Sequence, residues 1–132
     1  MPEESMIAVI DDDDSFRTAL VESLRSQGYA VDDFPSADEF VSAADIDSYG
    51  CIVTDIHMPG MSGIELARRL VGRAPRVPLI MVTARTEPGL DGIAAANEVV
   101  CLLRKPFGSD TLTACIEKAL SRDPQAGFDT HP

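Results

Sequence analysis

The stretch MIAVIDDDD, residues 6–14, places five apolar residues directly before four aspartates. A short apolar run that ends at a polar cluster indicates a buried strand. A second apolar run, CIVTD at residues 51–55, also ends on an acid. Because open parallel sheets bind ligands beyond the carboxyl ends of their strands, the two runs predict a sheet that carries these acids along one edge.

Strand-like and helix-like periods alternate along the rest of the chain. Apolar residues recur at helical spacing after Asp14, and Gly28 supplies a residue that can end this helix at positive φ. Two capping boxes of the form S-x-x-E, at residues 36–39 and 62–65, predict the starts of two further helices. The chain therefore repeats a strand followed by a helix.

This alternation yields five strand–helix pairs. Parallel strands need helical crossovers, so the pattern predicts a three-layer α/β domain with helices on both faces of a parallel sheet. The second strand is less apolar and is expected at a sheet edge, whereas Gly92 weakens the fourth helix. The expected strands span residues 6–10, 29–34, 51–54, 78–83 and 99–103, and the last two helices residues 87–97 and 112–120.

The size and charge of the chain restrict its organisation and its partners. The 132 residues fit one domain, residues 1–121, followed by a segment without periodicity, residues 122–132, that we expect to be a flexible tail. The net charge of −11 disfavours direct binding of nucleic acid or of anionic membranes. The start of the chain has neither a basic segment nor an apolar signal core, so a cytoplasmic location is expected.

The three cysteines are Cys51, Cys101 and Cys115, an odd number spaced far apart within apolar stretches. Such spacing suits reduced core thiols better than a disulfide framework or a zinc site. We therefore predict that all three are packing residues.

Polar side chains that can handle a phosphoryl group follow four of the five strands. They are expected to meet on one rim of the sheet, where clustered carboxylates need a divalent cation or a positive side chain to offset their charge, and Mg²⁺ is the natural candidate. Asp55 can attack as a nucleophile and form an aspartyl phosphate, while Thr83 donates a hydrogen bond and Lys105 pairs with phosphoryl oxygens. The predicted site comprises Asp11, Asp12, Asp55, Thr83 and Lys105.

Four motifs, taken together and in this order, resemble the receiver domains of bacterial two-component response regulators. They are DD at residues 11–12, TDIHMPGMSG at 54–63, VTA at 82–84 and KPF at 105–107, and the likeness runs nearly end to end. The resemblance implies a flavodoxin-like (βα)5 doubly wound sheet with strand order 2-1-3-4-5. It also implies a cis peptide bond before Pro106 that aims Lys105 into the pocket.

The resemblance further implies what each residue does. Asp55 would accept a phosphoryl group from a phosphohistidine of a histidine kinase or a histidine phosphotransfer protein. Mg²⁺ would be held by Asp12, Asp55 and the backbone carbonyl of His57, with Asp11 contributing through a bound water. By this likeness the chain is expected to be a stand-alone response regulator that switches a protein-binding surface for an unknown downstream protein. It would catalyse only its own phosphorylation and dephosphorylation, and a homodimer is possible.

Some residues fall outside this pattern. Asp13 and Asp14 extend beyond the acidic pair and are expected to cap the first helix. The His57 side chain is expected to face solvent, and His57 and Arg85 are bulky enough to slow hydrolysis of the acyl phosphate. Leu102 stands where many receivers carry an aromatic residue, so signalling through the surface of the fourth helix, fifth strand and fifth helix is in doubt.

Two other functions share part of this pattern. A phosphorylation-independent adaptor would work by protein contact alone, but the complete set of site residues argues against it. A Mg²⁺-dependent phosphohydrolase of the haloacid dehalogenase type also uses an aspartyl phosphate. Those enzymes place a second acid two residues after the nucleophile, where this chain has His57, and the chain lacks an obvious cap domain.

Overall fold

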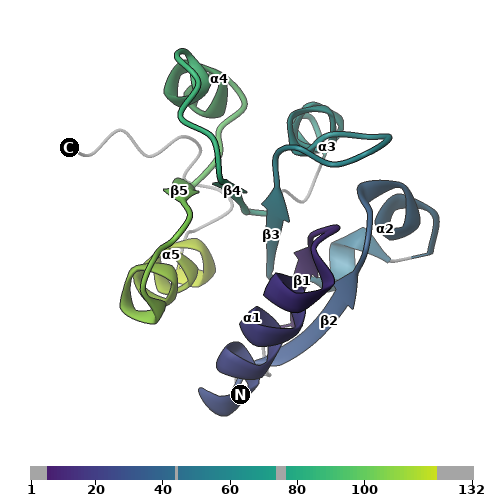
Figure 1. Cartoon of the computed structure of the whole chain (residues 1–132). Helices are drawn as coiled ribbons and strands as arrows, with labels where there is room; N and C mark the ends of the chain where they lie inside the picture. The colour runs from purple at the N-terminus through teal and green to yellow at the C-terminus, as the bar shows by residue number, and fades with distance from the viewer. Residues whose placement is uncertain (1–5, 44, 74–76, 122–132) are drawn as a thin grey trace.

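The fold is a five-stranded parallel sheet in the order β2-β1-β3-β4-β5, with helices between the strands (Figure 1). The computed structural model describes residues 6–43, 45–73 and 77–121. The strands are β1 (Met6–Ile10), β2 (Ala30–Phe34), β3 (Cys51–Asp55), β4 (Leu79–Thr83) and β5 (Cys101–Arg104). The helices are α1 (Asp14–Ser26), α2 (Ala37–Ala43), the short 3-10 helix η1 (Ile46–Ser48), α3 (Gly63–Leu70), α4 (Leu90–Ala96) and α5 (Ser109–Ser121).

Helices cover both faces of the sheet, as Figure 1 shows. Helices α1 and α5 pack on one face, where Ile7 and Val9 of β1 point, and α2, α3 and α4 pack on the other, where Ala8 and Ile10 point. Every residue of β3 and β4 is buried, as expected for strands enclosed on two sides. The three-layer architecture and the strand order 2-1-3-4-5 are therefore confirmed.

The predicted helix ends are also found in the structure. Asp13 is the N-cap of α1 and its side chain accepts a hydrogen bond from the backbone N–H of Phe16. Ser62 and Glu65 form both bonds of a capping box at the start of α3. Gly28 lies just beyond α1 with φ of 98°, a conformation that costs little without a Cβ atom.

Several boundaries differ from the sequence prediction by one to three residues, and α5 begins at Ser109 rather than at residue 112. Helix α4 begins at Leu90 rather than at residue 87, because Gly89 takes a left-handed φ of 90° directly before it. Strand β5 begins at Cys101 rather than at residue 99, although Val100 still donates a backbone hydrogen bond to the carbonyl of Leu79. The predicted edge position of β2 and the cis peptide bond between Lys105 and Pro106 are both present.

The cysteine prediction is wrong for two of the three residues. Cys101 of β5 and Cys115 of α5 are joined as a disulfide, with Cα atoms 6.2 Å apart. Their separation along the chain gave no hint of this, because the turn after β5 folds α5 back across the strand. Cys51 is free and buried, as predicted.

Two further points concern the end of the chain and the character of its helices. The expected tail, residues 122–132, lies outside the described residues. Among the helices that are described, none combines the length and the apolar character that crossing a bilayer requires.

Candidate functional site

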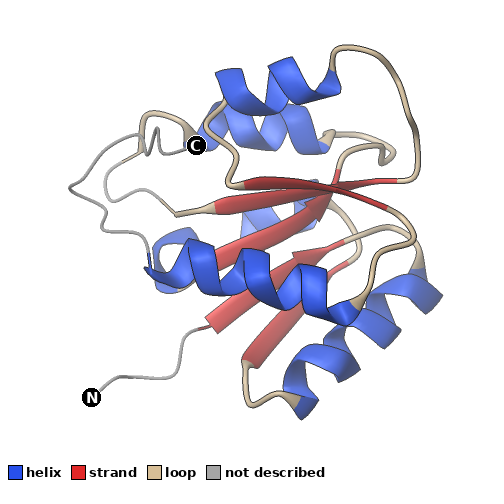
Figure 2. Cartoon of the chain, turned by 90° about the vertical axis from the view of Figure 1, so that its left-hand side faces the viewer, coloured by secondary structure: helices blue, strands red, loops and turns tan. Residues whose placement is uncertain are grey.

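The strand register brings the predicted site residues to one edge of the sheet. Ile10 of β1 pairs with Thr54 of β3, so Asp11 and Asp55 follow at the same level. Thr83 pairs with Arg104, so Lys105 leaves β5 beside the end of β4. All five strands run in the same direction (Figure 2), and their carboxyl ends therefore share this edge.

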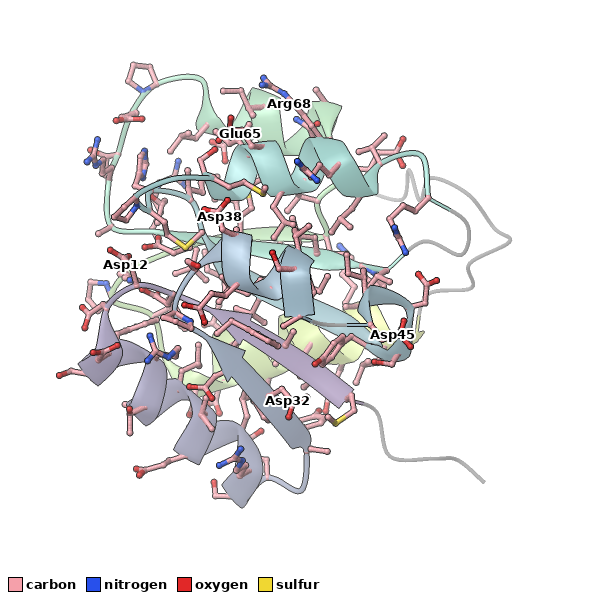
Figure 3. All side chains as sticks on the ribbon, turned by 90° about the vertical axis from the view of Figure 1, so that its right-hand side faces the viewer. Asp12, Asp32, Asp38, Asp45, Glu65 and Arg68 are labelled. Carbon is pink, nitrogen blue, oxygen red and sulfur yellow. A yellow bond between two sulfur atoms is a disulfide. The ribbon has the colours of Figure 1, made fainter. Side chains whose placement is uncertain are left out.

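Three carboxylates form the acidic part of this edge. Asp11, Asp12 and Asp55 each offer an oxygen, and these oxygens lie within 4.8 Å of one another. Asp11 is 2% exposed and Asp55 is 8% exposed, whereas Asp12 is exposed to solvent at the end of the sheet opposite Asp45 (Figure 3). An all-oxygen set with one solvent-facing member fits Mg²⁺, which takes one or two carboxylates and keeps several waters.

Burial and the neighbouring acids perturb Asp55. Burial first, and then the charge of Asp11, raise the pKa of Asp55 to about 6, although Lys105 and the backbone N–H of Ile56 lower it. Such a shift is expected where carboxylates crowd together without a cation. Positive charge that arrives at the site therefore favours the ionised form of Asp55.

The ammonium group of Lys105 supplies positive charge beside the buried acids. Its Nζ lies 3.2 Å from Asp11 Oδ2 and 4.0 Å from Asp55 Oδ2. The backbone N–H of Lys105 donates to the carbonyl of Thr83, which fixes the chain where it leaves β5. The ammonium group also lies over the Phe16 ring, and Phe16 packs edge-on against Phe107. The predicted convergence of acids and lysine is therefore present.

Thr83 is fully buried at the end of β4. Its Oγ1 accepts a hydrogen bond of 3.0 Å from the backbone N–H of Arg85. A hydroxyl that accepts in this way keeps its own hydrogen for a further acceptor. The arrangement suits a donor to a bound anion.

Sequence reasoning missed the residues that hold Asp11 in place. Arg17 of α1 donates from Nη1 to the Asp11 carbonyl at 2.6 Å and binds the side chains of Asp14 and Asp33. The backbone N–H of Asp13 donates to Asp11 Oδ1 at 2.9 Å. Arg17 thereby ties the ends of β1 and β2 to the start of α1. Only its helical spacing from the acids could have suggested this role.

The loop after β3 is packed tightly against the site. A Cβ atom at Gly63 would overlap the carbonyl oxygen of Asp55, so only glycine lets α3 start so close to the strand. The backbone N–H of Gly63 donates to the Ile56 carbonyl, and that of Met61 donates to Asp38 of α2. These contacts fix the backbone of the loop that follows Asp55.

His57 and Arg85 both contact the same acid, Glu87. His57 Nε2 lies 3.4 Å from Glu87 Oε1, and Arg85 Nη1 lies 3.2 Å from Glu87 Oε2. Arg85, and then His57, hold the pKa of Glu87 below its usual range. The expectation that the His57 side chain faces open solvent needs correction, because it is only 28% exposed and lies against Glu87. The role of the His57 carbonyl stays a prediction.

Known proteins share both the sequence and the fold. A family model described as response regulator receiver domain matches residues 7–117. The transcriptional regulatory protein FixJ of Azorhizobium caulinodans is 37% identical over 127 residues, covering 96% of this chain and 60% of that protein. FixJ of Bradyrhizobium diazoefficiens is 38% identical over 120 residues, covering 91% and 58%. The chain thus spans about three fifths of the length of these relatives.

Solved structures agree with this likeness. The crystal structure of FixJ-N superposes with a TM-score of 0.83 and 30% identity, covering 92% of this chain and 98% of that one. The chemotaxis protein CheY4 of Vibrio cholerae superposes with a TM-score of 0.79 and 26% identity, covering 89% and 100%. The similarity therefore extends over nearly all the residues that form the sheet and its helices.

Proposed function

Because the chain belongs to the response regulator receiver family, we propose that it accepts a phosphoryl group on Asp55 in a Mg²⁺-dependent reaction. The donor is a phosphohistidine of a histidine kinase or of a histidine phosphotransfer protein. The observation that most supports this proposal is the position of Lys105 Nζ, 3.2 Å from Asp11 and 4.0 Å from Asp55. That position lets one ammonium group face both the acids and an incoming phosphoryl group.

The chemistry follows from the chain's own groups. A carboxylate oxygen of Asp55 attacks the phosphorus atom, the bond from phosphorus to the donor imidazole breaks, and its electron pair returns to the imidazole nitrogen. Thr83 donates its hydroxyl hydrogen to a phosphoryl oxygen, and Lys105 pairs with another. Mg²⁺ held by Asp12, Asp55 and the His57 carbonyl, with Asp11 reaching it through water, would offset the charge on the phosphoryl oxygens.

The output of the switch is protein contact. We propose that phosphorylation changes a surface that binds a downstream protein, and that the chain turns over no substrate beyond its own phosphorylation and dephosphorylation. A homodimer is one form that this contact can take. Direct binding of nucleic acid is disfavoured by the net charge of −11. A cytoplasmic location fits a partner kinase that uses ATP.

Whether the receiver works as a single-domain protein stays a prediction, because the named relatives are longer than this chain. Two of them are called transcriptional regulatory proteins. The intact mass of the protein isolated from its native cells tests the single-domain organisation.

The decisive experiment is intact-mass detection of phosphorylation. The protein is incubated with acetyl phosphate and Mg²⁺, beside Asp55→Asn and beside the matched control Asp45→Asn, which changes an acid at the opposite end of the sheet (Figure 3). One phosphoryl group is expected on the native protein and on Asp45→Asn, and none on Asp55→Asn. No modification of the native protein would favour the adaptor. Rapid multiple turnover of phosphate esters would favour the phosphohydrolase.

A further inference from the structure

The disulfide between Cys101 and Cys115 takes no part in the proposed phosphoryl chemistry. Cys101 is the first residue of β5, at the opposite end of the strand from Lys105. Cys115 lies in the middle of α5 on the side that packs against the sheet. The pair therefore links the last strand to the last helix at a point away from the acidic edge.

The backbone holds the two cysteines at a distance that a disulfide can bridge. Their Cα atoms are 6.2 Å apart, inside the range that a disulfide spans without backbone movement. Cys101 is partly exposed and Cys115 is 8% exposed, so Cys101 is the more accessible residue of the two. A second thiol held at this spacing can resolve a mixed disulfide formed at the first.

Cys51 provides an internal contrast. It lies in β3, is fully buried and has no disulfide partner. Burial raises the pKa of its thiol to about 12, so its thiolate is scarce at neutral pH. Of the three cysteines, only the pair combines access with a partner.

We propose that Cys101 and Cys115 form a reversible redox modification site, at which a disulfide oxidant of the glutathione class joins α5 to β5. Disulfides in reducing compartments are usually transient and respond to redox conditions, so with the proposed cytoplasmic location this pair fits a reversible site better than a permanent brace. This inference does not depend on the proposed phosphorylation of Asp55.

The exchange balances in two steps. The Cys101 thiolate attacks oxidised glutathione, forms a mixed disulfide and releases one glutathione thiolate. The Cys115 thiolate then attacks the Cys101 sulfur and releases the second glutathione. Two cysteine thiols are oxidised to one disulfide, one oxidised glutathione is reduced to two thiols, and the two protons pass to the released thiolates.

The closed segment, residues 101–115, contains the turn that carries Lys105 and the first half of α5. Closing it removes freedom from the unfolded chain and so stabilises the folded one. For a loop of this length in a domain of this size, we expect a rise in Tm of about 10 °C. Amide exchange in α5 should slow as well, because the helix can no longer separate from β5 without the whole unit opening.

The first test counts thiols. The protein is equilibrated with oxidised glutathione, or with an excess of reduced glutathione, then unfolded, alkylated and weighed intact. One alkylated cysteine is expected after oxidation and three after reduction. Three after both treatments would overturn the proposal, as would a disulfide between two chains or a bond that excess reduced glutathione fails to open.

The second test measures Tm with and without dithiothreitol. We expect the native protein and the matched control Cys51→Ala to lose about 10 °C on reduction, and Cys101→Ala to show no change. Cys101 is chosen because it is the less buried partner, so its replacement leaves the packing of α5 intact. A Tm that reductant does not alter in the native protein, or alters equally in Cys101→Ala, would overturn the proposed link.

Discussion

The ammonium group of Lys105 lies 3.9 Å from the centroid of the Phe16 ring. Phe16 belongs to the first turn of α1, whereas Lys105 follows β5. The contact therefore joins a helix near the start of the chain to a turn near its end. The ring attracts the cation and packs against Phe107 in the turn after Lys105. Phe16 therefore acts as a positioning residue for the lysine.

Replacing Phe16 with leucine should weaken phosphorylation without disturbing the metal site. Leucine keeps the apolar contact but removes the ring, which is worth about 0.5–1 kcal/mol to a partly exposed cation. We expect Phe16→Leu to phosphorylate about 2–5 times more slowly with acetyl phosphate, at unchanged Mg²⁺ affinity. Phe16→Tyr keeps the ring and is the control. Equal rates in both variants would contradict the role of the ring.

Ionisation of Asp55 should destabilise the metal-free protein. Its pKa is about 6 in the folded protein against an ordinary value of 3.8, so the folded state binds the proton more tightly. This contribution to stability is fully present below pH 3.8 and is lost as the pH rises through 6. Asp55→Asn lacks the charge, and its Oδ1 can still accept from Ile56.

In urea unfolding without divalent ions, Asp55→Asn should therefore be more stable than the native protein by about 1–2 kcal/mol at pH 7. The difference should vanish below pH 4. The expected difference in the free energy of unfolding is smaller than the full pKa shift would give. The reason is that the variant also loses the attraction of Lys105, 4.0 Å away. A difference that grows toward acid pH would contradict the raised pKa.

Mg²⁺ should stabilise the native protein at neutral pH. At a concentration of about 100 times Kd, it adds about 2.7 kcal/mol to the free energy of unfolding. The gain should fall away below pH 6, where Asp55 binds a proton instead. Asp12→Asn should lose most of it, whereas Asp45→Asn, changed at the opposite end of the sheet, should keep it. Equal gains in both variants would place the ion elsewhere.

The group formed by His57, Arg85 and Glu87 should lengthen the life of the acyl phosphate. The two bulky side chains meet at Glu87, close in sequence to Asp55 and Thr83, and we expect them to obstruct the water that hydrolyses the acyl phosphate. We expect the His57→Ala, Arg85→Ala double variant to lose its phosphoryl group several times faster, measured by intact mass over time. Arg68→Ala removes an exposed arginine from α3 and controls for charge. Unchanged decay in the double variant would contradict a role of these side chains in slowing hydrolysis.

Gly63 should be intolerant of a side chain. A methyl group there meets the carbonyl oxygen of Asp55, so Gly63→Ala should cost about 1–3 kcal/mol and slow phosphorylation by displacing the end of β3. Gly92→Ala is the matched control, because its Cβ meets nothing within 4 Å inside α4 and should stabilise that helix by about 0.5–1 kcal/mol. Thermal unfolding and intact mass together separate the two effects.

The sequence was most informative where one segment carried its own signal. Apolar runs that end in acids placed Asp11 and Asp55, and capping boxes placed the helix starts. These features are local, and the rule that parallel strands share an edge supplied the rest. The start of α4 was misplaced because the turn signal of Pro88 and Gly89, where Gly89 takes a left-handed φ, was counted as part of the helix.

Contacts between distant segments were not predictable in the same way. The Cys101–Cys115 link depends on how α5 returns across β5. The Phe16–Lys105 contact depends on the direction of the Lys105 side chain, which reaches a helix near the start of the chain. Arg17 likewise reads as an ordinary helix residue until β1 and β2 are placed beside it. Such partners are fixed by tertiary packing, and no period along the chain encodes them.

The position of β2 at the outside of the sheet also affects how copies of this protein meet in concentrated solution. Its outer residues include the exposed pair Asp32 and Asp33. Charges on an edge strand oppose the addition of a further strand, since two such edges would bring like charges together. The charges on β2 therefore disfavour growth of the sheet by edge-to-edge pairing of two copies at this strand.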